Sequence, residues 1–222
     1  MQTIVTSYAN HPEYLDDFRF LADRFYPSYF TCYDIAPEGE SKGSQILRIL
    51  ETIAKPYFIL IEDDFFFIRA VIIEKLRRLG DFCRDHNVDR FSLQSKNAHS
   101  FSDWTAGDLF HDGKQIFKTN EQVQIPFSME ASIWRRDFML EHVEPWMTER
   151  DIEVTISNRI RNKSHKIYAF EDCVLHYRDA MRNGRRVISL DRKSFTLSVN
   201  KGEELALYPD LDNSKDRRLC LT

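Results

Sequence analysis

The sequence predicts an α/β protein, with a mixed, mainly parallel sheet flanked by helices in a single domain. Short apolar runs of strand length alternate with segments whose apolar residues recur at helical spacing, as in parallel sheets with crossover helices. The strongest run, residues 57–61, is followed at once by three carboxylates. At 222 residues and 42% hydrophobic content, the chain can bury one large core.

Strands and helices alternate through the first half of the chain. Pro12 suits the first turn of a helix, where its missing amide proton is not needed, and Ser44 can cap a second helix. The expected strands are residues 3–9, 29–35, 57–61 and 90–94, and the expected helices are residues 12–25, 44–54 and 70–86.

The second half is patterned less regularly. Residues 95–115 are polar and are predicted to form a loop. Further strands are expected at residues 116–118, 123–134 and 166–176, and further helices at residues 136–143 and 151–162. The domain is therefore predicted to span residues 1–188, and the charged, weakly patterned residues 189–222 are predicted to be a peripheral tail.

Composition excludes several classes of protein. A net charge of −4 and an isoelectric point near 6.0 argue against nucleic acid as a partner. The four cysteines are widely spaced, unlike those of a zinc site or a disulfide framework. No apolar run reaches the roughly 20 residues that span a bilayer, and the amino-terminal residues lack a signal-peptide pattern. We expect a cytoplasmic protein without a transmembrane segment, and the pattern indicates no particular oligomeric state.

The three carboxylates Glu62, Asp63 and Asp64 end a predicted buried strand. Acids buried together without partners are costly, but they are tolerated at a cleft where they share a divalent cation. The carboxyl ends of strands in open α/β sheets are the usual ligand sites. Oxygen ligands favour Mg²⁺ or Mn²⁺, often together with substrate phosphates. The triplet therefore predicts a metal–phosphate site, with acids facing water as the simpler alternative.

Two stretches resemble nucleotide-sugar-dependent glycosyltransferases of the GT-A fold, of the bacterial and viral type. The first is SKGSQILRILETIAKPYFILIEDD at residues 41–64, in which a helix and a strand lead to the acids. The second comprises FSMEASIWRRDFM at residues 127–139 and EPWMTE at residues 144–149. The resemblance covers roughly residues 1–187. It implies transfer of a sugar from a nucleoside-diphosphate sugar to a hydroxyl acceptor such as a glycan.

In enzymes of this family a D-x-D triplet holds Mn²⁺ or Mg²⁺ against the donor diphosphate. The matching triplet here begins with Glu62 instead of aspartate, so Asp64 is the preferred ligand by position and Glu62 the second. The resemblance also implies that His176, late in the chain, binds the same metal ion. A hydrogen-bonded histidine at a strand edge is the alternative.

The resemblance implies donor-binding residues around the triplet and in the basic run after His176. They are Thr6, Ser7, Tyr8, Lys42, Ser44, Asp63, Arg178, Arg182 and Arg185. Arginine suits a diphosphate because its planar fork donates two parallel hydrogen bonds. A solvated basic loop would explain the same arginines, and helix capping alone would explain Ser44.

An inverting transfer needs a carboxylate base, and Glu149, Asp151 and Glu153 surround the start of the helix predicted at residues 151–162. By resemblance Glu149 is the first choice and Asp151 the second, while Glu130 is a weaker third. The helix dipole favours acids at this position in any protein, which is the alternative explanation.

Trp134 and Trp146 are the candidate acceptor-binding residues, because apolar sugar faces pack on aromatic rings. Burial in the core is the alternative for at least one of them.

Other functions compatible with the same acids are a Mg²⁺-dependent nucleotidyltransferase, an inactive sugar- or nucleotide-binding module and, more weakly, a metal nuclease. Nucleotidyltransferases generally carry a glycine-rich loop after the first strand. Here Ala9-Asn10-His11-Pro12 follows that strand, without glycine.

Overall fold

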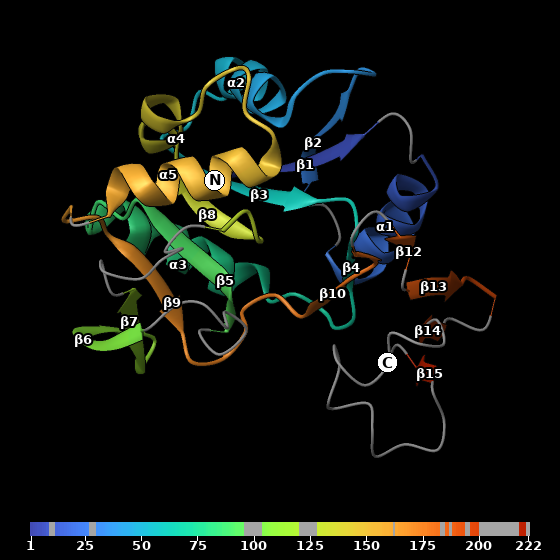
Figure 1. The fold of residues 1–222 in the computed structure, drawn as a ribbon. Coiled ribbons are helices and arrows are strands. Elements are labelled where there is room, and N and C mark those ends of the chain that lie inside the picture. Colours follow the sequence, from blue (N-terminus) through green and yellow to red (C-terminus); the bar gives the residue numbers. More distant parts are fainter. Residues whose placement is uncertain are drawn as a thin grey trace.

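The computed structural model describes residues 1–8, 12–26, 30–95, 104–119, 128–161, 163–182, 185–186, 188–193, 196–199 and 218–220. Its centre is an eight-stranded sheet with the strand order β2-β1-β3-β8-β5-β9-β7-β6 (Figure 1). The strands are β1 (Gln2–Tyr8), β2 (Phe30–Ala36), β3 (Tyr57–Glu62), β5 (Arg90–Ser95), β6 (Trp104–His111), β7 (Lys114–Thr119), β8 (Ser132–Arg135) and β9 (Ile167–Phe170).

The sheet is mixed, with β7 and β8 running opposite to the other six strands. The parallel pairs are β1–β2, β1–β3 and β5–β9. This arrangement confirms the predicted mixed sheet flanked by helices. It also gathers the carboxyl ends of β2, β1 and β3 at one edge of the molecule.

Helices cover both faces of the sheet (Figure 1). Helices α2 (Lys42–Thr52), α4 (Arg136–His142) and α5 (Glu149–Ile160) pack on one face, and α1 (Pro12–Phe25) and α3 (Ile73–Asp85) on the other. Strand β3 shows why the sequence folds this way: Ile59 and Ile61 join the α1/α3 core, whereas Phe58 and Leu60 join the opposite core. No described helix is long and apolar enough to cross a membrane.

Beyond the triplet, the chain leaves the main sheet. Residues 63–64 form a turn, and β4 (Phe65–Phe67) then pairs antiparallel with β10 (Tyr177–Asp179). The three phenylalanines are buried, and the ring of Phe65 stacks on Tyr177 at 4.5 Å between centroids. The phenylalanine run therefore forms a second short strand that fixes the turn carrying the acids.

The prediction of a loop at residues 95–115 is wrong for the second half of that range, where strand β6 and the start of strand β7 form a hairpin. Asp112 and Gly113 form its turn with φ angles of 50° and 74°, the left-handed conformation that Asp-Gly favours in hairpins. The strand predicted at residues 166–176 is shorter, because β9 ends at Phe170. Residues 123–127 of another predicted strand lie outside the described part of the chain.

The described segments of the predicted tail form a small antiparallel sheet of β13 (Ile188–Asp191), β14 (Thr196–Val199) and β15 (Arg218–Cys220). Arg192, just after β13, donates hydrogen bonds of 2.9 and 2.6 Å to Asp17 of α1. This charged contact links the start of the tail to the main domain. Cys32, Cys83 and Cys173 are free thiols.

Candidate functional site

The carboxyl ends of β1 and β3 bring together five of the predicted site residues. Thr6 stands opposite Glu62 in the parallel register, and the Asp63 amide donates a 3.1 Å hydrogen bond to the Thr6 carbonyl. Ser7 follows on β1, and Lys42 reaches the same point from the first turn of α2. Thr6, Ser7, Lys42 and Asp63 are buried, so they form the floor of the candidate site.

Lys42 supplies the positive charge of this floor. Its ammonium lies 2.5 Å from Glu62 Oε1 and donates a 3.0 Å hydrogen bond to Thr6 Oγ1. The Lys42 side chain is 1% exposed and that of Glu62 is 13% exposed. An ion pair this deeply buried is weakly screened by solvent. The first acid of the triplet is therefore already neutralised by the protein's own cation.

Asp63 is the most deeply buried acid of the triplet. Its Oδ2 accepts a 2.5 Å hydrogen bond from the Ser7 hydroxyl. Burial raises the pKa of Asp63 to about 6, and the charge of Glu62 adds to the rise, while the Ser7 hydrogen bond and Lys42 oppose it. Asp63 therefore lies in the floor of the site, with the Ser7 hydroxyl as its hydrogen-bond donor, and its donor-binding role stays a prediction.

Asp64 remains as the acid of the triplet at the rim of the site. Its side chain is half-buried, and its backbone carbonyl accepts a 2.7 Å hydrogen bond from the Ala180 amide. Among the described residues, no three His, Cys, Asp or Glu side chains converge as a ready-made metal site. Mg²⁺ commonly binds through one or two carboxylates plus substrate phosphates, and Asp64 fits that smaller role.

The strand register argues against the prediction that His176 shares a metal ion with Asp64. The His176 carbonyl accepts a 3.0 Å hydrogen bond from the Ile68 amide, and β10 then runs antiparallel along β4 until Ala180 reaches Asp64. Four strand positions separate His176 from Asp64, or about 13 Å at 3.3 Å per residue. The register therefore does not bring the two residues together.

The backbone of the predicted arginine cluster lies nearer to the triplet than that of His176 does. Arg178 lies on β10 opposite Phe66. Arg182 and Arg185 pair with each other across the short antiparallel strands β11 (Met181–Arg182) and β12 (Arg185–Arg186). This hairpin starts directly after Ala180, the residue bound to Asp64. The side chains of these arginines and of Tyr8, at the end of β1, lie outside the described part of the structure.

Ser44 does not cap α2 and instead anchors a neighbouring loop. The N-cap is Ser41, whose hydroxyl accepts a 3.1 Å hydrogen bond from the Ser44 amide. The Ser44 hydroxyl donates a 2.9 Å hydrogen bond to the Pro145 carbonyl. Gly43 makes this close packing possible, since a Cβ there would meet the Glu144 carbonyl. The donor role predicted for Ser44 gains no support from these contacts.

The three acids at the start of α5 have different surroundings. Glu149 is exposed. Asp151 closes a capping box: its Oδ2 accepts hydrogen bonds of 3.0 Å from the Thr148 amide and 2.7 Å from the Thr148 hydroxyl, and these bonds lower its pKa. Glu153 faces inward and accepts a 2.8 Å hydrogen bond from the Met129 amide. Only Glu153 points toward the sheet.

Glu153 belongs to a buried polar cluster that the sequence reasoning missed. Its pKa is raised by burial, and the charges of Glu130 and Glu62 add to the rise, while the Met129 hydrogen bond and Arg90 oppose it. The centre of this cluster is Arg90, which is 1% exposed. The pairing of Arg90 and Glu130 could have been suspected only from knowing that β5 and β8 are neighbours.

Arg90 is satisfied by short polar contacts. Its guanidinium donates hydrogen bonds of 3.0 Å to Ser132, 2.9 Å to Ser128 and 3.4 Å to Glu130. It also lies 5.1 Å from the ring centre of Trp134. These contacts compensate for the burial of its charge.

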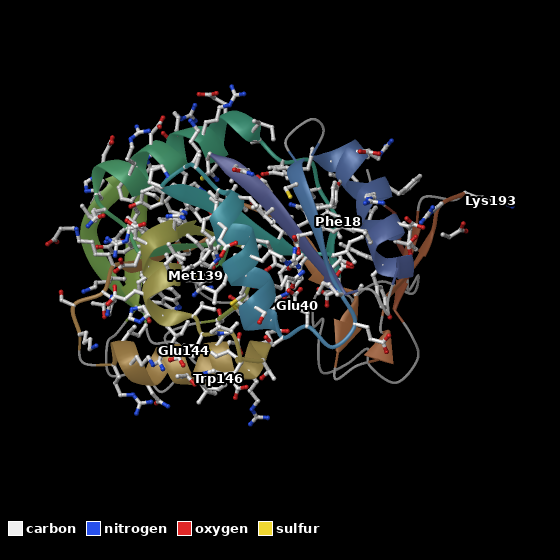
Figure 2. All side chains as sticks on the ribbon, turned by 90° about the horizontal axis from the view of Figure 1, so that it is seen from above. Phe18, Glu40, Met139, Glu144, Trp146 and Lys193 are labelled. Carbon is white, nitrogen blue, oxygen red and sulfur yellow. The ribbon has the colours of Figure 1, made fainter. Side chains whose placement is uncertain are left out.

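The two predicted acceptor tryptophans differ in exposure. Trp134 is fully buried in the core, which favours the alternative that it packs in the core over an acceptor-binding role. Trp146 is 58% exposed, and its indole donates a 2.6 Å hydrogen bond to Glu144 Oε2. Figure 2 shows Glu144 and Trp146 beside α5. Trp146 alone of the pair is accessible to a ligand.

Comparison with known proteins shows similarity of structure without similarity of sequence. No family model matches the chain. No curated protein sequence matches it either. Among solved structures, A197 from STIV has a TM-score of 0.50 at 14% identity, covering 90% of this chain and 94% of that one.

Two further similar solved structures are complexes with nucleotide sugars. UDP-glucose pyrophosphorylase complexed with UDP-glucose has a TM-score of 0.46 at 13% identity, covering 80% of this chain and 74% of that chain. S. aureus TarS 1–349 in complex with UDP-GlcNAc has a TM-score of 0.47 at 12% identity, covering 84% of this chain and 60% of that chain. At such identities likeness bears on fold alone, and the chain shares the mixed α/β fold of A197.

Proposed function

We propose that this protein is a glycosyltransferase that binds the diphosphate of a nucleotide sugar at the carboxyl ends of β1 and β3. The observation that carries the proposal is the Lys42–Glu62 ion pair, with side chains 1% and 13% exposed, just before Asp64 in the chain and at the edge where ligands bind in such sheets. A sheet end without a ligand has little reason to bury a lysine and two acids together.

The floor residues preorganise this site. Lys42, bridging Glu62 and Thr6, holds the carboxyl ends of β1 and β3 and the start of α2 in one arrangement, and it neutralises Glu62. Arg178, two residues before the Ala180 contact with Asp64, and Arg182 and Arg185, on the strands after it, are the proposed partners of the diphosphate. Fixed charges and dipoles of this kind stabilise a leaving diphosphate without reorganising during the reaction.

A divalent cation, Mn²⁺ or Mg²⁺, is part of the proposal, with Asp64 as its protein ligand and donor phosphates completing its shell. When bound, such an ion neutralises charge on the leaving diphosphate. Glu62 is not needed as a ligand because Lys42 occupies it. Asp64 would hold the ion only together with the donor.

Glu153 is the catalytic base that the geometry favours. In an inverting transfer the acceptor oxygen bonds to the anomeric carbon, the bond from that carbon to the phosphate oxygen breaks, and the acceptor proton moves to the base. Burial and the neighbouring acids raise the pKa of Glu153, which makes its carboxylate a better proton acceptor. Asp151 is held by its capping box, and Glu149 is exposed. Trp146 is the proposed acceptor platform.

The proposal is tested by calorimetry with a panel of nucleoside diphosphates and Mn²⁺, followed by turnover assays with the matching sugar donor. Glu153→Gln keeps an oxygen for the Met129 amide, so it should fold and bind donor while losing about 10²–10⁴ in turnover. The control Glu149→Gln should lose little. Full activity of Glu153→Gln would reject the base. Turnover of nucleoside triphosphates with pyrophosphate release would instead identify a nucleotidyltransferase.

A further inference from the structure

A second concave site lies at the opposite end of the sheet from the triplet. It is a cavity of about 470 Å³ between the starts of β1 and β3 and one side of α3. Figure 1 shows β1 and β3 running away from the amino terminus toward the triplet end. Five residue steps separate Tyr57 in the cavity wall from Glu62, or about 17 Å along the strand. The cavity is therefore separate from the proposed donor site.

One stripe of α3 lines the cavity. Arg77, Gly80, Asp81 and Arg84 follow the spacing i, i+3, i+4 and i+7, which places them on the same side of the helix. Gly80 leaves the middle of this stripe without a side chain. A Cβ at that position would lie 3.1 Å from the sulfur of Met1, so even one added carbon would crowd the cavity wall.

The lining is basic although the whole chain is acidic. Lys55, Arg77 and Arg84 contribute three positive charges against the single carboxylate of Asp81, whereas the net charge of the protein is −4. Arg84 contacts Asp81 at 2.9 Å, and Arg77 is 3.8 Å from Glu74. These pairs are exposed and contribute little to stability, so an anion can compete for both guanidinium groups.

The rest of the lining is apolar or aromatic. It consists of Met1, Pro56 and Tyr57. Tyr57 is 7% exposed, and its hydroxyl has no hydrogen-bond partner within the described part of the chain. A buried hydroxyl without a partner is uncommon in folded proteins. A volume of this size suits a small organic ligand better than a bare ion.

We propose that this cavity binds a small molecule carrying a phosphate group on a ring, with Arg77, Arg84 and Lys55 on the phosphate and the Met1–Pro56–Tyr57 wall on the ring. Arginine pairs with phosphate oxygens through two parallel hydrogen bonds. The site goes beyond the proposed glycosyl transfer and does not depend on it.

Phenyl phosphate is the probe, with inorganic phosphate as the comparison without a ring. Calorimetry should show tighter binding of phenyl phosphate, and hydrogen exchange should show protection of amides in residues 77–85. The exposed double variant Lys55→Gln/Arg77→Gln should weaken binding at least tenfold, about the value of one charge-assisted hydrogen bond. Gly80→Leu, which fills the cavity without changing its charge, should abolish it. Lys163→Gln, an exposed lysine outside the cavity, is the matched control and should change affinity less than twofold.

Three results would overturn the site: equal affinity of both variants and the wild type, protection confined to residues 62–65, or equal affinity for phenyl and inorganic phosphate. If Gly80→Leu failed to fold, the double variant would still decide, since its side chains are at the surface. Loss of donor binding in Asp64 variants would leave this result untouched.

Discussion

Replacing Lys42 by methionine should lower the free energy of unfolding by about 3–5 kcal/mol, the usual effect of removing one partner from a buried ion pair. The charges of Lys42 and Glu62 are 2.5 Å apart, and their side chains are 1% and 13% exposed. At an effective dielectric constant of about 20, the attraction lost is roughly 7 kcal/mol. Part of that loss is returned because the lysine no longer has to be desolvated.

Urea denaturation of the wild type, Lys42→Met and the double variant Lys42→Met/Glu62→Met measures this effect. The double variant should recover most of the loss, since exchanging a whole buried pair for apolar side chains is often close to neutral. A loss below about 1 kcal/mol in the single variant, the value of a surface pair, would refute the buried bridge between β1, β3 and α2.

Three further predictions follow from the same contacts. Because burial raises the pKa of Asp63 from 3.8 to about 6, the unfolded chain loses this proton first, so the free energy of unfolding should fall by roughly 3 kcal/mol between about pH 3 and 7, with most of the fall between about pH 4 and 6. In Asp63→Asn, urea denaturation across that range should lack this component, and its persistence would assign the pH dependence to another group. Trp134→Ala should lower the free energy of unfolding by about 3–5 kcal/mol. Trp146→Ala should leave the denaturation midpoint unchanged and raise the acceptor KM. Equal losses of stability in the two variants would contradict the difference in their burial. In calorimetry with Mn²⁺ and the diphosphate that binds, Asp64→Asn should weaken binding more than about tenfold, the effect of one lost charge-assisted contact. His176→Ala should leave the affinity unchanged. A loss of affinity in His176→Ala would restore His176 to the metal site.

The alternating pattern of the first half was sufficient to predict its main strands and helices, because β3 is apolar on both faces and each helix has one apolar stripe, whereas the short strand β4 was missed. The strand expected at residues 57–61 and the turn of acids after it lie where the pattern predicts, in β3 and residues 63–64. The β6–β7 hairpin was missed although Asp112-Gly113 is a strong hairpin signal. Strand β6 is largely exposed, so its composition resembles that of a loop.

The pairing of site residues was less predictable than their positions. Sequence order placed Lys42 and the acids near one another, but only the register of β1 with β3 brings Glu62 to Thr6 and to the lysine. The register of β10 with β4 likewise separates His176 from the triplet. Arg90 lies 40 residues from Glu130 in sequence, and their contact depends on β5 and β8 being neighbours. No local pattern contains that information.

Hydrogen exchange with mass spectrometry, carried out with each nucleoside diphosphate of the panel in the presence of Mn²⁺, tests the donor site most directly. The diphosphate that binds should protect amides in residues 62–65 and in the β10 segment at residues 177–180, which joins them through the Asp64–Ala180 hydrogen bond. Protection elsewhere without any at residues 62–65, or binding by no member of the panel, would contradict the proposal that β1 and β3 end in a nucleotide-sugar site.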